Sequence, residues 1–337
     1  MIDELDFQLI NALQLHPRAS WAQLESVLDS DATTLSRRWA RLTGDGLVWS
    51  TAYPTTRKEW GTGPNVVCAF VEVNCAASRR EDVLRELGGL AGVLSVDCTS
   101  GARDLMLTLV MTSVAEIDRY VADAVATVGG VQATRTNFIS RFFADGSDWR
   151  LHVLRDRQVQ AILALKGTIH DAPEVPTAHL MEVLTALGSD IRLAASAIAL
   201  DTGRSVSSVN RSIRGLMHAG WVQSRIEIAH TAIGFDATTM LWYSVPRAQV
   251  EAVGSAISLQ PETRMCAGVV GSANLAVTLW LKDLEQLDEV ESRVARLFPS
   301  ALVVDRWLLP RQVKRIGHLI GTDGRHGGYV EPVRTVR

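Results

Sequence analysis

The chain has 337 residues, of which 47% are hydrophobic and 21% are charged, and its formal net charge is −3. A chain of this length is expected to form several domains, each with its own core, and the net charge gives no sign of a uniformly basic surface. No apolar run approaches the roughly 18 residues that span a bilayer, and the opening MIDELDFQLINAL lacks the basic and apolar regions of a secretory signal, so we expect a cytoplasmic protein with no membrane segment.

The first 50 residues predict three short helices. Apolar residues recur at helical spacing in residues 5–15, and Ser20 is a candidate N-cap for the helix WAQLESVL that follows. A third helix is expected within SDATTLSRRWARL, residues 30–42, with Ser30 as its N-cap. Its core stripe would be Leu35, Trp39 and Leu42.

The outer face of this third helix is basic and rich in hydroxyl groups. Three helices followed by Gly46 and the extended segment LVWSTAY are typical of a winged helix-turn-helix. Small hydroxyl residues leave room in a DNA groove, and arginines contact phosphates or guanines, although a solvated helix face is the alternative. The candidate DNA-binding residues are Thr33, Thr34, Ser36, Arg37, Arg38 and Arg41.

The next segment alternates strands and helices. Strands are expected at residues 66–73, 93–100, 103–111 and 131–138, and helices at 78–89 and 113–130, with Ser78 and Ser113 as caps. The order strand, helix, strand, strand, helix, strand predicts a ferredoxin-like domain.

A second, diverged copy follows. Residues 197–224 align with residues 24–50 after a two-residue insertion, and Gly220 corresponds to Gly46. Ser205 would cap the second recognition helix, and its outer face offers Ser207, Asn210, Arg211 and Arg214. Strands at 240–245, 263–270, 274–281 and 301–308, with helices at 246–259 and 283–298, repeat the ferredoxin-like order.

The expected fold class is therefore α+β, a tandem repeat of two winged helix-turn-helix domains and two ferredoxin-like (βαββαβ) α/β sandwich domains. The boundaries are 1–50 and 177–225 for the helix-turn-helix domains, 65–144 and 226–310 for the ferredoxin-like domains, 51–64 for a linker, 145–176 for a helical insert and linker, and 311–337 for a flexible basic tail.

Catalytic and metal-binding patterns are not recognisable. The four cysteines, Cys68, Cys75, Cys98 and Cys266, lack a zinc spacing and are expected to be buried fillers. The eight histidines are scattered, and neither GxSxG nor GxxxxGK[ST] occurs. The sequence predicts no enzyme, no cofactor and no metal.

The chain resembles the Lrp/AsnC family of feast/famine transcription regulators, in which a helix-turn-helix is joined to a ferredoxin-like sensing domain. The opening IDELDFQLINALQLHPRAS is similar to the family's first-helix pattern. SGARDLML (100–107) and VGSANLAVTL (270–279) are similar to its Gly-x-x-Asp/Asn turn. The resemblance runs from residue 2 to about 310, twice over, apart from the insert at 145–176 and a weaker first-helix signature in the second copy.

The resemblance implies a sequence-specific DNA-binding transcriptional regulator that binds double-stranded DNA. It implies modulation by a small-molecule effector such as an amino acid, bound near Gly101, Asp104, Gly271 and Asn274. A tight turn that needs Gly for its backbone and Asp or Asn for a hydrogen bond is the equal alternative for these residues. The resemblance also implies an intrachain pseudo-dimer that self-associates into a homo-oligomer.

Two other functions remain open at this point. The chain could be a ligand-binding or oxygenase-like ferredoxin-fold protein whose helical domains do not bind DNA, because fold does not settle function. It could also be a corepressor-like protein whose second helix-turn-helix contacts protein. Within the regulator hypothesis, the first recognition helix is expected to carry more DNA affinity, because its basic face is denser.

Overall fold

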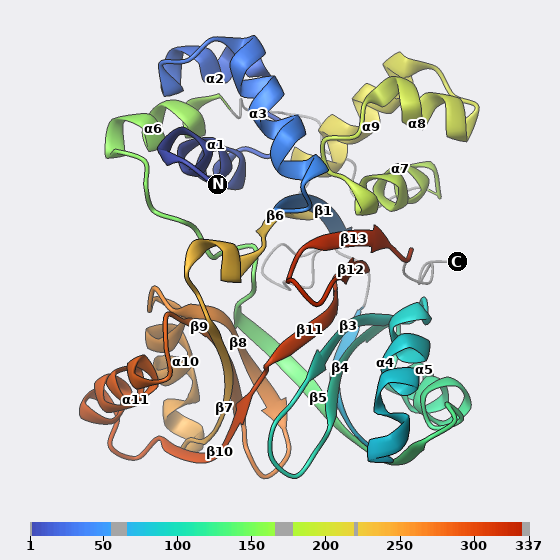
Figure 1. Cartoon of the computed structure of the whole chain (residues 1–337), viewed down its shortest axis with the longest axis vertical. Helices are drawn as coiled ribbons and strands as arrows, with labels where there is room; N and C mark the ends of the chain where they lie inside the picture. Colours follow the sequence, from blue (N-terminus) through green and yellow to red (C-terminus); the bar gives the residue numbers. More distant parts are fainter. Residues whose placement is uncertain (1, 55–65, 166–177, 219–221, 332–337) are drawn as a thin grey trace. The chain divides into compact units, whose positions relative to one another are not determined.

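The computed structural model describes residues 2–54, 66–165, 178–218 and 222–331 (Figure 1). Its contacts define two compact units. Unit 1 comprises residues 1–64, 150–229 and 336–337, and unit 2 comprises residues 65–149 and 230–335. Each unit thus combines segments from both sequence repeats. The helices and antiparallel sheets confirm the mixed α+β class.

The first helical head of unit 1 has three helices and a strand: α1 (Glu4–Leu15), α2 (Trp21–Leu28), α3 (Ala32–Gly44) and β1 (Val48–Pro54). Ser20 caps α2 as predicted, because its side chain accepts a hydrogen bond from the Gln23 backbone. The predicted N-cap of α3 was wrong by one residue. Asp31, not Ser30, has the extended backbone of an N-cap, and its side chain accepts from the Thr34 backbone at 2.8 Å.

The second head repeats this order with α7 (Ala178–Ser189), α8 (Ala195–Thr202), α9 (Val206–His218) and β6 (Val222–Ile228). The predicted cap of α9 is confirmed, since Ser205 Oγ accepts from the Ser208 backbone at 3.2 Å. The core stripes align as expected. Leu35, Trp39 and Leu42 on α3 and Val209, Ile213 and Leu216 on α9 are all buried.

The two heads are joined by a two-stranded antiparallel ribbon. β1 pairs with β6 along its whole length, from Val48 opposite Ile228 to Pro54 opposite Val222. The insert between the repeats contributes α6 (Asp156–Ala164), which packs on the first head. Asn11 Oδ1 accepts from the Val153 backbone at 3.0 Å, which fixes the chain leading into α6.

Unit 2 contains two halves with the same order of elements. The first half is β2 (Val67–Cys75), α4 (Arg80–Gly89), β3 (Val93–Cys98), β4 (Leu105–Met111), α5 (Val114–Tyr120) and β5 (Val131–Ala144). The second half is β7 (Ala237–Ser244), α10 (Val250–Ser258), β8 (Thr263–Val270), β9 (Leu275–Leu281), α11 (Glu285–Leu297) and β10 (Leu302–Leu308). Ser113 caps α5 as predicted, but α4 has no side-chain cap, so the prediction for Ser78 was wrong.

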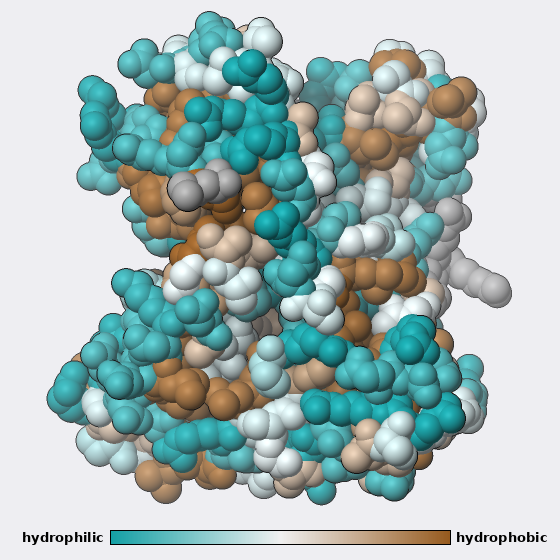
Figure 2. All heavy atoms as spheres, in the orientation of Figure 1, coloured by the Kyte–Doolittle hydropathy of each residue, from teal (hydrophilic) through white to brown (hydrophobic). Residues whose placement is uncertain are grey.

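One sheet runs through both halves of unit 2. The strand orders β5-β2-β4-β3 and β10-β7-β9-β8 correspond position by position, and β5 pairs antiparallel with β8 to connect them. The helices cover the outer faces of the two half-sheets (Figure 1). In Figure 2 the surface over α4 and α5 is mostly hydrophilic, as expected for helices that turn their apolar side to a sheet.

The inner faces of the two half-sheets share an apolar cluster. Phe70 and Met106 from the first half pack with Met240, Trp242 and Trp307 from the second. The Phe70 ring meets Trp242 edge-on, with ring centroids 6.2 Å apart. Separate cores lie between each half-sheet and its own helices. The halves are therefore held together by side-chain packing as well as by the β5–β8 pairing.

The expected flexible tail is instead largely β-structure. Residues 311–329 contain three strands: β11 (Arg311–Arg315), β12 (His318–Ile320) and β13 (His326–Tyr329). β11 pairs with the free edge of β3, so the chain passes directly from β10 in the second half to the first half. Lys314 is fully buried and its Nζ donates to the Leu90 carbonyl at 2.8 Å. Residues 332–337 lie outside the described residues.

The four cysteines are free and buried, as predicted. Burial raises the pKa of the Cys68 thiol to about 12 and also raises that of Cys266. None of the helices in the described ranges has the length and apolarity needed to cross a bilayer. Within the same ranges, no group of three or more His, Cys, Asp or Glu residues is arranged to hold a metal ion.

The shared inner cluster predicts that the halves of unit 2 open together. Phe70→Ala removes a ring from this cluster and should destabilise unit 2 by about 3–5 kcal/mol. Alkylation of Cys68, in the first half, and of Cys266, in the second, should then both accelerate by about 100-fold or more. Mass spectrometry after timed alkylation measures both sites. Leu302→Ala, at a 61% exposed position, is the control that should leave both rates unchanged. Acceleration at Cys68 alone would show that the halves open independently.

Candidate DNA-binding faces and ligand turns

The outer face of α3 is less available than its sequence suggests. Arg38 Nη1 donates to Asp3 Oδ2 at 2.6 Å and to Asp6 Oδ1 at 2.9 Å, and Arg41 pairs with the other oxygen of Asp6. Asp6 is fully buried, so these ion pairs are held in place. The hydrogen bonds that Arg38 donates to Asp3 and Asp6 raise the pKa of Arg38. Two of the three arginines on α3 therefore bind the start of α1.

Arg37 is the exposed arginine of α3. Its guanidinium makes no ion pair or hydrogen bond with any residue that the structure describes. Thr33 is also exposed, whereas Thr34 and Ser36 are half-buried. At the N-terminus of the helix, hydrogen bonds from the side chain and backbone of Thr34 hold the pKa of Asp31 below its usual range. A fixed negative charge thus sits at the N-terminus of α3.

The outer face of α9 is more open. Ser207, Asn210, Arg211 and Arg214 are all exposed. Among the described residues, neither arginine has a partner in an ion pair or a hydrogen bond. The N-cap is the neutral Ser205, where α3 has the charged Asp31. The sequence predicted a denser basic face on α3, whereas in the structure α9 offers two exposed guanidiniums and no acid at its start.

In both predicted ligand turns, the Asp or Asn side chain forms a hydrogen bond with the backbone at the end of a neighbouring strand. Asp104 Oδ2 accepts from the Cys75 backbone at 2.8 Å, while its own backbone N–H donates to the Val73 carbonyl at 3.0 Å. In the second half, Asn274 Oδ1 accepts from the Val245 backbone at 2.9 Å and its Nδ2 donates to the Val245 carbonyl at 2.7 Å. Both side chains thus form hydrogen bonds with backbone groups.

The two turns differ in their glycines. Gly101 is exposed and has φ +86°, a left-handed conformation that favours glycine. Gly271 is also exposed, and a Cβ there would approach Asn137 Oδ1 at 3.3 Å. The structure brings Gly101 and Asp104 into one turn and Gly271 and Asn274 into the other, in the tight-turn geometry that the sequence left as the alternative.

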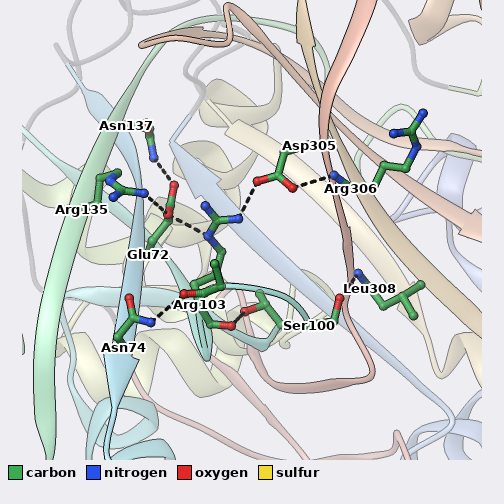
Figure 3. A network of polar contacts seen from close by, with 11 residues as sticks. Glu72, Asn74, Ser100, Arg103, Arg135, Asn137, Asp305, Arg306 and Leu308 are labelled. Atoms are coloured by element: carbon green, nitrogen blue, oxygen red, sulfur yellow. Dashed lines mark hydrogen bonds and ion pairs between the residues drawn. The ribbon is translucent and has the colours of Figure 1, made fainter.

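Sequence reasoning missed Arg103, which lies inside the first turn. Figure 3 shows its guanidinium between Glu72 and Asp305. Nε donates to Glu72 Oε2 at 2.8 Å, Nη1 donates to Asp305 Oδ2 at 2.7 Å, and the guanidinium lies 3.9 Å from the centroid of the Trp307 ring. Arg103 therefore links β2 and β10, one from each half of unit 2.

Glu72 is the centre of this network. Its side chain is 8% exposed and also accepts from Arg135 Nη1 at 3.2 Å and from Asn137 Nδ2 at 2.9 Å (Figure 3). A buried carboxylate needs such partners to offset its lost hydration. A signal was present in the sequence, because Glu72 is the one charged residue of the apolar strand VVCAFVEV.

Comparison with known proteins identifies the class of the first half of unit 2. Residues 68–148 match the family model of the Lrp/AsnC ligand binding domain. An uncharacterized HTH-type transcriptional regulator of Pyrococcus abyssi is 22% identical over 139 residues, which are 41% of this chain and 86% of that protein. The HTH-type transcriptional regulator Ptr1 of Methanocaldococcus jannaschii is 22% identical over 147 residues, 44% of this chain and 97% of that protein. The predicted relationship to the Lrp/AsnC proteins is confirmed.

A likeness along almost the whole chain comes from a solved structure. The siroheme decarboxylase NirDL, crystallised with an iron-uroporphyrin III analogue, matches with a TM-score of 0.58 over 93% of both chains, at 14% identity. At this identity the match establishes a shared fold. It also contradicts the prediction that the chain is not an enzyme, because a protein that shares its fold over 93% of the chain is one.

The turn geometry predicts opposite outcomes for two exchanges. Asp104→Asn should be tolerated, because the corresponding Asn274 makes the same contact to the strand end. Asn274→Asp places a carboxylate against the Val245 carbonyl and should cost about 1–3 kcal/mol at neutral pH. That carboxyl would have a raised pKa in the folded state, so the cost should shrink as the pH falls toward about 4. Urea unfolding at several pH values measures this. Equal effects of the two exchanges would contradict the assigned contacts.

Proposed function

We propose that the chain is a sequence-specific DNA-binding transcriptional regulator that carries two winged helix-turn-helix heads and two ferredoxin-like sensing halves in one polypeptide. The observation that carries this proposal is the duplicated head, with an exposed recognition helix in each copy and an antiparallel ribbon joining them. The regulators among its relatives support the same function.

The two recognition helices would contribute unequally to DNA binding. In a helix-turn-helix, residues near the start of the recognition helix meet base edges, and arginines along it meet phosphate or guanine. On α9 these are Ser207, Asn210, Arg211 and Arg214. On α3 they are Thr33, Thr34, Ser36 and Arg37. Arg38 and Arg41 of the same helix are engaged in ion pairs with acidic residues at the start of α1. Repulsion between Asp31 and DNA phosphates further weakens the α3 face.

Regulation would act through unit 2. We propose that a small effector such as an amino acid binds at the exposed turns of Gly101 and Gly271, where it would meet backbone groups, since the Asp104 and Asn274 side chains already bind strand ends. The pairing of the two halves would supply the intrachain pseudo-dimer, and the edge strands of the sheet, β10 and β13, would allow a homo-oligomer to assemble.

Arginine substitutions test the DNA-binding proposal. Arg211→Ala with Arg214→Ala should weaken binding to genomic fragments by about 30-fold or more, since each arginine that reads a guanine contributes about 1–3 kcal/mol and about 1.4 kcal/mol corresponds to tenfold in affinity. Arg37→Ala should have a smaller effect. If the lost contacts are to phosphate, the slope of log affinity against log salt should fall by about one per arginine. Fluorescence anisotropy at several salt concentrations measures both. Arg157→Ala, at an exposed position on α6, is the control. Unchanged binding in all variants would refute the proposal.

A second candidate function follows from the match to the decarboxylase. Unit 2 contains Arg264 and Arg315, with guanidiniums 4.4 Å and 5.1 Å from the Trp280 ring, and His230 stacks on the same ring at 5.0 Å. Cationic and aromatic groups bind carboxylate-bearing tetrapyrroles. Arg264 and Arg315 are each 7% exposed and Trp280 is 2% exposed, so a tetrapyrrole would reach these groups only if the cluster opened. Titration with siroheme, followed by absorbance and by release of CO₂, tests this candidate. A shifted absorbance band with CO₂ release would support it, and an unchanged spectrum would eliminate it.

A further inference from the structure

The two heads of unit 1 form an arginine exchange, in which each head extends an arginine to the backbone of the equivalent loop of the other head. Arg18 lies three residues after the end of α1, and Arg192 lies three residues after the end of α7. Arg192 Nη1 donates to the carbonyls of Pro17 at 2.6 Å and Ala19 at 3.0 Å, the two residues that flank Arg18. The exchange is reciprocal.

Arg18 makes the matching contacts in the other direction. Its Nη1 donates to the carbonyls of Ile191 and Leu193, the two residues that flank Arg192. Each guanidinium thus binds the backbone on both sides of its counterpart, as expected for two copies related by a pseudo-twofold axis. Because backbone carbonyls are the acceptors, the contact fixes the paths of the loops themselves.

The chemistry of this exchange requires guanidinium groups. Burial lowers the pKa of Arg18, and it lowers that of Arg192 to about 10, while the nearby Asp190 carboxylate opposes both shifts. Both side chains therefore stay charged at neutral pH. The planar Arg192 group also lies 4.1 Å from the centroid of the Trp21 ring, at the start of α2. A lysine ammonium lacks the flat, forked geometry that serves carbonyls and a ring together.

The ribbon provides a second attachment between the heads. Beside the β1–β6 pairing, Thr51 Oγ1 donates to the Gly188 carbonyl at 2.7 Å, and Ser50 Oγ donates to Asp190. A single attachment would let one head rotate about it. Two attachments, one through loops and one through strands, leave little freedom for the recognition helices to change their separation.

We propose that Arg18 and Arg192 are positioning residues that hold α3 and α9 at one preset separation, so that one chain reads a single non-palindromic DNA site with a fixed distance between unlike half-sites. This inference rests on the proposed DNA-binding function. The half-sites would be unlike because the exposed residues of the two recognition helices differ: Thr33 and Arg37 on α3, against Ser207, Asn210, Arg211 and Arg214 on α9.

A measurement without DNA tests the preset separation. Spin labels on Ala40→Cys in α3 and Val206→Cys in α9 occupy exposed positions, and the four native cysteines are buried. Double electron–electron resonance should give a single narrow distance distribution in this labelled chain. Arg18→Lys with Arg192→Lys should broaden it, and Arg157→Lys should not. A broad distribution with native arginines, or an unchanged one in the double variant, would overturn the inference. Arg192→Lys alone keeps one half of the exchange, and it is the variant to measure if the double variant does not fold.

A measurement with DNA tests the consequence. A duplex selected from a random-sequence pool would be lengthened by 2 or 5 base pairs between its two protected half-sites. The native chain should lose about tenfold or more in affinity, because one head can no longer reach its half-site. The double lysine variant should bind all spacings within about threefold of one another, with unchanged affinity for a single half-site. Equal tolerance of spacing by the native chain would overturn the inference alone, whereas failure of any duplex to be enriched would overturn the proposed function with it.

Discussion

The pairing of two diverged repeats inside one polypeptide is the constraint on which this structure depends. In unit 1 the pairing consists of the arginine exchange between Arg18 and Arg192 and of the β1–β6 ribbon. In unit 2 it consists of the β5–β8 pairing, the contact of Phe70 with Trp242, and the ion pair between Arg103 and Asp305. Neither repeat completes a unit by itself, because each unit draws its contacts from both.

Covalent linkage allows the repeats to diverge. The two turns make matching hydrogen bonds, so their residues can be aligned between the repeats. In this alignment Glu72 corresponds to Trp242, and Arg103 corresponds to Ala273. A buried ion pair in the first half thus corresponds to an apolar pair in the second, where Trp242 is 5% exposed and Ala273 is also 5% exposed. A homodimer must place identical residues at both sites, whereas a fused chain can build one polar and one apolar version of the same position.

The two heads have also diverged, in the charges on the outer faces of α3 and α9. On α3, acids from α1 neutralise two arginines and an acid caps the helix, whereas α9 keeps both arginines exposed and is capped by a serine. Under the proposed function, this asymmetric pair of heads would suit an asymmetric DNA site. The same fold in the decarboxylase NirDL shows that this architecture also serves catalysis, so the function depends on which side chains occupy its surfaces.

Much of the fold was predictable because local patterns encode it. Apolar spacing located the core stripes of α3 and α9, and β-branched runs located the strands of unit 2, including β8 at residues 263–270. The misses depend on contacts distant in sequence. The partners of Arg38 and Arg41 lie more than 30 residues away at Asp6, and β11 forms because β3 has a free edge. The choice of Asp31 over Ser30 as the α3 cap depends on backbone angles that two adjacent cap-forming residues do not distinguish.

A quantitative footprinting titration tests the central claim most directly. The selected duplex would be titrated with the chain well above the dissociation constant, and protection would be followed separately at each half-site. If two unlike heads form one DNA-reading body, both half-sites should fill along the same curve and saturate at one chain per duplex. Half-sites that fill independently, or that need two chains per duplex, would contradict the account.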